Sequence, residues 1–198
     1  MSELEITCQV FKDILKIKEE LERRGFSYKK EFWIDDTYFY NKQTKKFSVK
    51  EGKLTDSLAV RYVNENDKKI ICKKYDSTGI EKSVLRVEDI QEAEKHLLLL
   101  GFEKMLTLKY KNYMYENEEY IVYIQEVKDL GVFIELEAKN QNNKTIDGLI
   151  KFIKTMDLQA GTEFNIRKAE LLYNKLNQNS LKWVNIRYIY LLCYHNML

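Results

Sequence analysis

Two short acidic pairs, far apart in the chain, carry the residue types best suited to chemistry. They read Glu3-Leu4-Glu5 and Glu135-Leu136-Glu137. In an extended strand, residues i and i+2 point to the same face, so each pair places two carboxylates side by side. Taken alone, each pair fits the solvated face of a half-buried sheet. If both pairs face one cavity, a divalent metal ion and a metal-bound ligand are the natural occupants, because neighbouring carboxylates repel each other.

Basic residues occur on the strands expected between the acidic pairs. They are Arg61, Lys73, and the alternating pair Lys109 and Lys111. Each of them alone fits the polar side of a strand. Together with the acidic pairs they would give a barrel whose polar face carries both signs of charge. Inside a barrel, such a face can bind a metal–polyphosphate, because lysine and arginine grip phosphates and carboxylates ligate hard cations.

Length, composition and charge narrow the class of protein. A chain of 198 residues with 44% hydrophobic residues fits one globular domain. Its 33 basic and 31 acidic residues nearly cancel, so the net charge of +2 gives no reason to expect nucleic acid or an anionic membrane as a partner. Three cysteines without Cys-x-x-Cys spacing fit reduced thiols. With no signal-peptide pattern and no apolar run of about 18 residues, a cytoplasmic protein without a membrane span is expected.

Other catalytic arrangements have little support in the sequence. The chain has only two histidines, and the Gly-x-Ser-x-Gly motif of triad hydrolases is absent. The phosphate-binding loop Gly-x-x-x-x-Gly-Lys-Ser/Thr is absent too, as is Gly-x-Gly-x-x-Gly. A phosphate site in this chain would therefore have to be built from charged strands.

Hydrophobic periodicity predicts an α+β protein that is predominantly β. Helices are expected at about 11–24, 89–100, 145–157 and 166–177. Asp89 is a predicted N-cap, and Gly25 and Gly101 follow the ends of the first two helices. Strands are expected where apolar and polar residues alternate with a period of two. One precedes Asp89, and the other seven are 2–10, 32–40, 58–63, 69–75, 103–115, 119–127 and 131–139. About eight mostly antiparallel strands predict a closed, tunnel-like barrel with helices outside.

The domain prediction separates a folded region, residues 1–178, from a C-terminal extension, residues 179–198. The extension is rich in aromatic and aliphatic residues and nearly free of acidic ones. It fits a last helix or strand packed on the barrel. A partner-binding segment and non-native sequence at the chain end are the other two interpretations.

The order of motifs over roughly residues 2–176 resembles the CYTH family of triphosphate tunnel proteins, which includes class IV adenylate cyclases and thiamine triphosphatases. The family's opening Glu-x-Glu-x-Lys is matched by Glu3-Leu4-Glu5-Ile6-Thr7. Its later strand motifs are matched by Asp36-Thr37-Tyr38-Phe39-Tyr40, Leu58-Ala59-Val60-Arg61, Ile71-Cys72-Lys73 and Lys109-Tyr110-Lys111. The most specific match to the family is the stretch Leu130-Gly131-Val132-Phe133-Ile134-Glu135-Leu136-Glu137.

The resemblance implies an eight-stranded antiparallel tunnel with its charged faces turned inward. It also implies a metal-dependent triphosphatase or an adenylate cyclase that uses Mg²⁺ or Mn²⁺ and acts on ATP, thiamine triphosphate or tripolyphosphate. Glu3 and Glu5 would be catalytic, and Glu135 and Glu137 would bind the metal. The phosphate-binding residues would be Arg61, Lys73, Lys109 and Lys111. No partner among nucleic acids or membranes is expected.

Several residues depart from the family pattern. Thr7 replaces a lysine, Ala59 replaces an arginine, and Gln125 stands where the family usually has a metal-binding aspartate. Lys82, Val84 and Arg86 occupy places of alternating glutamates. These losses concern metal and phosphate contacts, so a catalytically degenerate tunnel is the alternative: a module that binds a phosphorylated ligand or a partner protein without turnover.

Overall fold

The computed structural model describes residues 4–51, 53–76, 79–140 and 144–177. Its elements follow the order β1 (Glu5–Val10), α1 (Ile14–Arg23), β2 (Ser27–Asn41), β3 (Val49–Lys50), β4 (Lys53–Leu54), β5 (Asp56–Asn64), β6 (Asp67–Asp76), β7 (Gly79–Arg86), α2 (Ile90–Leu99), β8 (Phe102–Glu116), β9 (Tyr120–Val127), β10 (Gly131–Ala138), α3 (Ile146–Thr155) and β11 (Ala160–Phe164). A fourth helix covers 168–177. The expected α+β class, with antiparallel strands and four helices, is confirmed.

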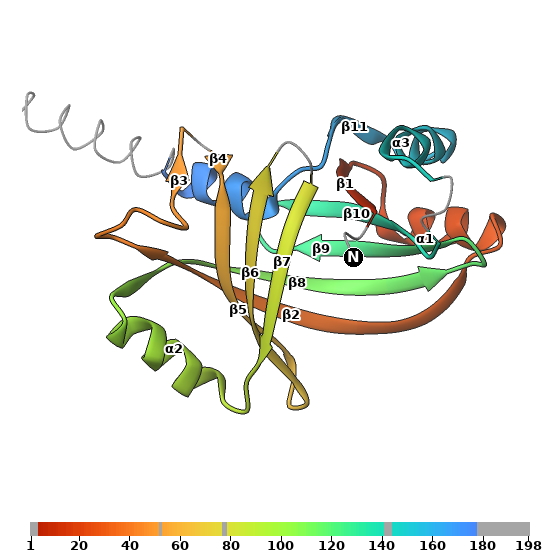
Figure 1. The fold of residues 1–198 in the computed structure, drawn as a ribbon. Coiled ribbons are helices and arrows are strands. Elements are labelled where there is room, and N and C mark those ends of the chain that lie inside the picture. The colour runs from red at the N-terminus through yellow and green to blue at the C-terminus, as the bar shows by residue number, and fades with distance from the viewer. Residues whose placement is uncertain (1–3, 52, 77–78, 141–143, 178–198) are drawn as a thin grey trace, which may run out of the picture.

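One antiparallel sheet forms the body of the molecule. Its nine strands are hydrogen-bonded in the order β11-β1-β10-β9-β8-β2-β5-β6-β7. The two longest strands, β2 and β8, pair over most of their length and form the centre of the sheet (Figure 1). Segments far apart in sequence therefore become neighbours: β1 pairs with β10, which brings the two acidic segments side by side.

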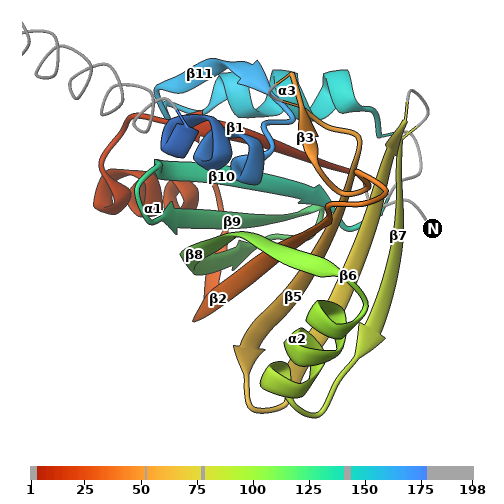
Figure 2. The same cartoon turned by 90° about the vertical axis from the view of Figure 1, so that its left-hand side faces the viewer.

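The sheet curls but does not close into the expected eight-stranded barrel. Figure 2 shows β1, β10 and β9 on one side of the curve and β5, β6 and β7 on the other. In the described part of the chain, β11 pairs only with β1 and β7 pairs only with β6. Alternation of apolar and polar residues gives strands with two different faces, but closure requires pairing between the two edge strands, which a period of two does not encode.

The fourth helix, 168–177, bridges the two sides of the curled sheet. Arg167, just before it, donates to the carbonyl of Leu54 in β4, and Glu170 accepts from the Leu54 backbone N–H. Further along, Lys175 donates to the carbonyl of Asp129 between β9 and β10. Buried side chains of this helix pack on one end of the concave face, so the helix connects strands that do not pair with each other.

The other helices cover the outer face of the sheet. Ile6, Cys8 and Val10 of β1 point toward α1 and α3 and form the largest buried cluster with them. Helix α2 packs on the outer face of β5. As predicted, Asp89 caps α2: its carboxylate accepts from the Glu92 N–H at 2.9 Å. Gly25 and Gly101 follow α1 and α2 with φ of +79° and +82°, the left-handed conformation that ends helices.

Glu20 of α1 is a buried carboxylate paired with two arginines, and its response to acid can be predicted. The residue is 6% exposed, and its carboxylate accepts from Arg24 Nε at 2.5 Å and from Arg23 Nη2 at 2.5 Å. The hydrogen bond from Arg24 is the largest cause of a pKa lowered from 4.5 to about 2. Arg24 also donates to the backbone of Thr155, which links α1 to the end of α3.

Because the pKa of Glu20 is lowered in the folded state, the stability that it contributes is present above pH 4.5 and is lost as the pH falls toward 2. Glu20→Gln should therefore reduce the free energy of unfolding at pH 7 by about 1–2 kcal/mol. Urea unfolding at several pH values checks this, and the difference between wild type and variant should shrink as the pH falls. A constant difference across pH would contradict the assignment.

No helix among the described residues is long and apolar enough to cross a membrane. The C-terminal extension, the predicted boundary at residue 178, and Glu3 lie outside the described residues, so the interpretations made for them stay predictions.

Candidate functional site

The concave face of the sheet encloses a cavity of about 780 Å³. Alternate residues of β1, β2, β5, β6, β8, β9 and β10 line it, together with Lys82 of β7 and the segment that enters the fourth helix. Its wall includes six basic residues, Arg61, Lys69, Lys73, Lys82, Arg167 and Lys168, and five acidic ones, Glu5, Asp36, Asp67, Glu135 and Glu137. The expected combination of both charge signs inside one cavity is therefore present.

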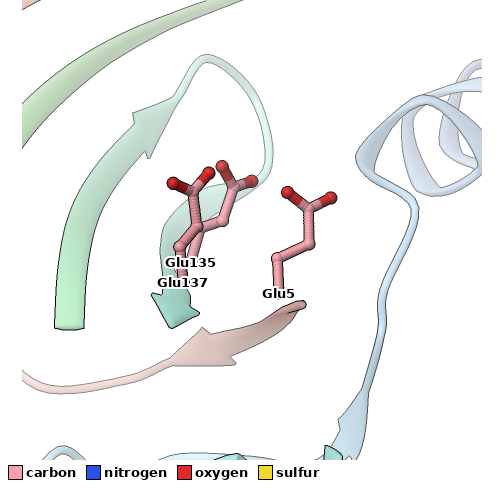
Figure 3. Close-up of side chains that lie close together, drawn as sticks. All are labelled: Glu5, Glu135 and Glu137. Carbon is pink, nitrogen blue, oxygen red and sulfur yellow. The ribbon is translucent and has the colours of Figure 1, made fainter. Parts of the chain in front are cut away.

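The acidic side comes from β1 and β10. In the antiparallel register, Glu5 lies opposite Glu137 and Thr7 lies opposite Glu135. Figure 3 shows the carboxylates of Glu5, Glu135 and Glu137 pointing to the same side, and one oxygen of each lies within 4.8 Å of the others. Carboxylate oxygens are the ligands that Mg²⁺ and Mn²⁺ prefer. The donor set thus fits a divalent metal ion.

Lys168 adds a cation to the acidic side that sequence reasoning did not single out. Its Nζ lies 3.3 Å from Glu135 Oε2 and also donates to Gln125 Oε1. Burial of Glu135 raises its pKa, but the charges of Lys168, Lys73 and Arg61 outweigh that effect and hold the pKa below its usual value. Glu135 is therefore ionised at neutral pH. The sequence gives no signal for this contact, because Lys168 lies on a helix whose docking only the tertiary fold determines.

Arg61 lines the cavity as expected, but its guanidinium is paired. Its Nε and Nη2 donate to the two oxygens of Asp36, both at 2.6 Å. Asp36 is 1% exposed, and the hydroxyl of Tyr110 reaches the same group, donating to Asp36 Oδ2 at 3.2 Å. An Asp36 bound in this way is not positioned to replace the missing aspartate at Gln125. Nor is Glu126, whose side chain is exposed on the opposite face.

The remaining basic wall comes from β6 and β7. Lys69 and Lys73 of β6 and Lys82 of β7 line the cavity. Lys73 was predicted from the sequence, and its charge is one of those that lower the pKa of Glu135. Lys82, which stands where the family has a glutamate, adds a positive charge to this wall.

Lys109 and Lys111 do not join the site, in contrast to the prediction. Lys109 forms an ion pair with Asp35 at 2.6 Å and Lys111 pairs with Glu31 at 2.8 Å, both on the outer face of β2 and β8. Because side chains alternate along a strand, the cavity-facing residues of β8 are Leu108, Tyr110 and Asn112. The resemblance to the family, together with their charge, predicts that these lysines point inward, but charged residues also occupy the solvated face of this strand.

Gln125 and Asn112 form a buried amide pair on the floor of the cavity. They are opposite each other in the β8–β9 register, and Gln125 Nε2 donates to Asn112 Oδ1 at 3.0 Å. Gln125 Nε2 also lies 3.4 Å from Glu135 Oε2. Gln125, which stands where the family has an aspartate, thus forms hydrogen bonds with Asn112, Glu135 and Lys168. Its amide occupies a place where a carboxylate would add a metal ligand.

Comparison with known proteins shows which proteins this chain is similar to. A putative adenylate cyclase of Methanocaldococcus jannaschii is 25% identical over 163 residues, which cover 80% of this chain and 91% of that protein. Among solved structures, a putative adenylate cyclase from Vibrio parahaemolyticus matches with a TM-score of 0.65 at 13% identity, covering 86% of this chain and 98% of that one. These similarities agree with the resemblance of the sequence to the CYTH-like triphosphate tunnel family. No family model matches the sequence.

A further match to this CYTH-like protein comes from Hippeastrum. That structure, of a putative adenylyl cyclase described as revealing a dominant triphosphatase activity, has a TM-score of 0.59 at 14% identity and covers 87% of this chain and 95% of that one. At such identities the structural matches show the shared fold. Which residues act in this CYTH-like protein depends on the geometry of its own cavity.

Proposed function

We propose that this CYTH-like protein is a metal-dependent triphosphatase that binds its substrate in the cavity of the curled sheet. The observation that carries the proposal is the opposition of charges in one cavity: the acidic residues of β1 and β10 line the same space as the lysines of β6 and β7. A triphosphate with a divalent metal complements both groups of charges. The triphosphatase activity described for the Hippeastrum protein supports a hydrolase rather than a cyclase as the first choice.

In the proposed reaction, Lys69, Lys73 and Lys82 bind the phosphate oxygens and hold the chain in a fixed register. Glu135 and Glu137 would hold Mg²⁺ or Mn²⁺, which when bound neutralises phosphate charge and orients a water molecule. The oxygen of the attacking water bonds to the terminal phosphorus, and Glu5 accepts the proton that this water loses. The bond between that phosphorus and the bridging oxygen breaks, which releases phosphate.

The direct test combines calorimetric titration with product analysis. Tripolyphosphate and ATP are titrated with and without Mg²⁺ or Mn²⁺, and phosphate and pyrophosphate are measured in the same samples. Metal-dependent binding with phosphate release is the expected result. Pyrophosphate release from ATP would favour an adenylate cyclase instead, and the absence of any binding would refute the proposal.

A matched pair of lysine variants tests which face of the sheet binds phosphate. Lys73→Gln removes a cation from the cavity wall, whereas Lys109→Gln makes the same change on the outer face. We expect Lys73→Gln to weaken tripolyphosphate binding by about 10- to 100-fold, the value of one charge-assisted contact. Lys109→Gln should bind like the wild type. Equal losses in both variants would mean that general electrostatic attraction, rather than this cavity, accounts for binding.

Binding without turnover is the second candidate, and a specific observation favours it. Lys168 and Gln125 lie beside Glu135, and Arg61 forms an ion pair with Asp36. Fewer side chains are therefore available to bind metal and phosphate than in the family pattern. In this case the titrations above would show affinity without release of phosphate or pyrophosphate.

A further inference from the structure

Lys168 carries an ammonium group into the acidic side of the cavity. Its side chain is 11% exposed, and its Nζ donates to Gln125 Oε1 and lies 3.3 Å from Glu135 Oε2. Carboxylate and amide oxygens are also atoms that hard cations such as Mg²⁺ and Mn²⁺ bind. The ammonium of Lys168 therefore contacts two oxygens of the kind that a metal ion at this end of the cavity would attract.

The cation that contacts Glu135 comes from the fourth helix and not from the neighbouring strands. In the β1–β10 register Glu135 lies opposite Thr7, and in the β9–β10 register it lies opposite Tyr123. Neither of these side chains carries a positive charge. A carboxylate in a partly buried position needs a cation close by, and in the metal-free protein Lys168 supplies it.

Other contacts hold the start of the fourth helix in place. Arg167, the residue before Lys168, donates to the carbonyl of Leu54 in β4. Its guanidinium also lies over the ring of Tyr75 in β6, 3.9 Å from the ring centroid. The lysine side chain is a flexible stem of four carbons. The ammonium can therefore move away from Glu135 while the backbone of the helix stays where it is.

We infer that Lys168 competes with the metal ion for Glu135 and thereby lowers the metal affinity of the acidic cluster. A metal ion bound to Glu135 Oε2 at about 2.1 Å would lie within about 5 to 6 Å of the ammonium in its present position. Two cations this close in a partly buried cavity repel each other, so the ammonium moves away as the metal binds. This competition rests on the proposed function, in which Glu135 is a metal ligand.

The exchange keeps the acidic cluster compensated in both states. Without metal, the ammonium of Lys168 balances one of the three carboxylates, which lie together on β1 and β10 (Figure 3). With metal, the divalent ion takes over that role. Because coupling between two binding events is reciprocal, removal of the ammonium must strengthen metal binding, and metal binding must release the ammonium. Lys168 is in this sense a positioning residue that acts through Glu135.

The first measurement is the affinity of the full chain for Mn²⁺ in the absence of any triphosphate, determined by electron paramagnetic resonance of the free ion. We expect Lys168→Met to bind Mn²⁺ about 5- to 150-fold more tightly than the wild type, the usual range of such coupling. Lys168→Arg keeps the positive charge and should show no gain. Lys175→Met is the matched control on the same helix, where Lys175 donates to the carbonyl of Asp129, and it should bind like the wild type.

The second measurement follows the released ammonium directly. The wild type is treated with a limiting amount of an amine-acetylating reagent, with and without Mn²⁺, and mass spectrometry quantifies the modification of each lysine. Mn²⁺ should raise the rate at Lys168, which is largely buried in the metal-free structure. The rate at Lys109, paired with Asp35 on the outer face, should not change. This measurement needs no variant, so it remains decisive if Lys168→Met folds poorly.

The outcomes separate the competition from the proposed function. A wild type that binds Mn²⁺ while Lys168→Met binds it no more tightly, or while acetylation of Lys168 is not accelerated, would overturn the competition and leave the metal site intact. If neither protein binds Mn²⁺, the metal site of the proposed function fails and the competition fails with it. A wild type without affinity for Mn²⁺, together with a Lys168→Met variant that binds it, would support the competition and would count against a metal-dependent reaction in the wild type.

Discussion

Glu135→Gln is expected to abolish the effect of Mg²⁺ or Mn²⁺ on triphosphate binding while leaving metal-free binding intact or stronger. The variant loses a carboxylate oxygen of the acidic cluster, and loss of a metal ligand should lower metal affinity by about 100-fold or more, since even outer-sphere changes cost 10- to 100-fold. The same change frees Lys168 from its acidic partner 3.3 Å away, which leaves an unpaired cation inside the cavity. An anionic ligand should then bind without metal at least as well as it binds the wild type.

Calorimetric titration of tripolyphosphate into wild type and variant, each with and without metal, checks both halves of this prediction. Glu126→Gln is the matched control, because Glu126 is exposed on the opposite face of β9, one residue from Gln125. It should behave as the wild type. Because the pKa of Glu135 is held below its usual value, Glu135 should stay ionised, and available as a metal ligand, as the pH falls toward that usual value. An unchanged metal effect in Glu135→Gln would place the metal elsewhere.

Much of the fold follows from local patterns in the sequence. A period of two places Glu5, Glu135 and Glu137 on the cavity face of their strands, and Leu136 and Ile6 on the covered face. Helix ends could be predicted because capping is local chemistry, as at Asp89. The pairing of β1 with β10 was not predicted, since no local pattern specifies which strands become neighbours. The ninth strand, β11, and the short β3–β4 pair were not predicted, because each is brief and lacks a clear alternation.

The site was harder to predict because charged residues occur both on the cavity face of the sheet and on its solvated outer face. Lys109 and Lys111 alternate as cavity residues would, yet their partners Asp35 and Glu31 lie on the outer face of the neighbouring strand. A charged residue on a strand indicates a polar face, but it does not distinguish the solvated side of a curled sheet from its polar interior. The uncharged Asn112 on the same strand lines the cavity instead. The charge pattern of a sequence cannot reveal that a neutral residue such as Asn112 faces the cavity.

The Asp36–Arg61 pair shows how a buried ion pair can be mistaken for a ligand site. From the sequence, Arg61 is predicted to be a phosphate-binding cation, because it ends a strand motif that resembles one of the family. In the structure its two donors match the two carboxylate oxygens of Asp36, and the Asp36 side chain is 2% exposed. The pair is neutral as a unit, so it adds little attraction for phosphate. Its main contribution is to connect β2 and β5 across the cavity wall.

Arg61→Met should therefore destabilise the protein strongly, because it leaves the Asp36 carboxylate buried without its cation. Removing one partner of a buried pair costs about 3–5 kcal/mol, whereas replacing both partners by apolar residues is often neutral. The double variant Arg61→Met/Asp36→Leu should accordingly recover most of the free energy of unfolding measured in urea. Its affinity for tripolyphosphate should fall less than that of Lys73→Gln. If the double variant folds well but binds tripolyphosphate as weakly as Lys73→Gln, then Arg61 must leave Asp36 to bind phosphate, and the pair would be a resting contact that the ligand displaces.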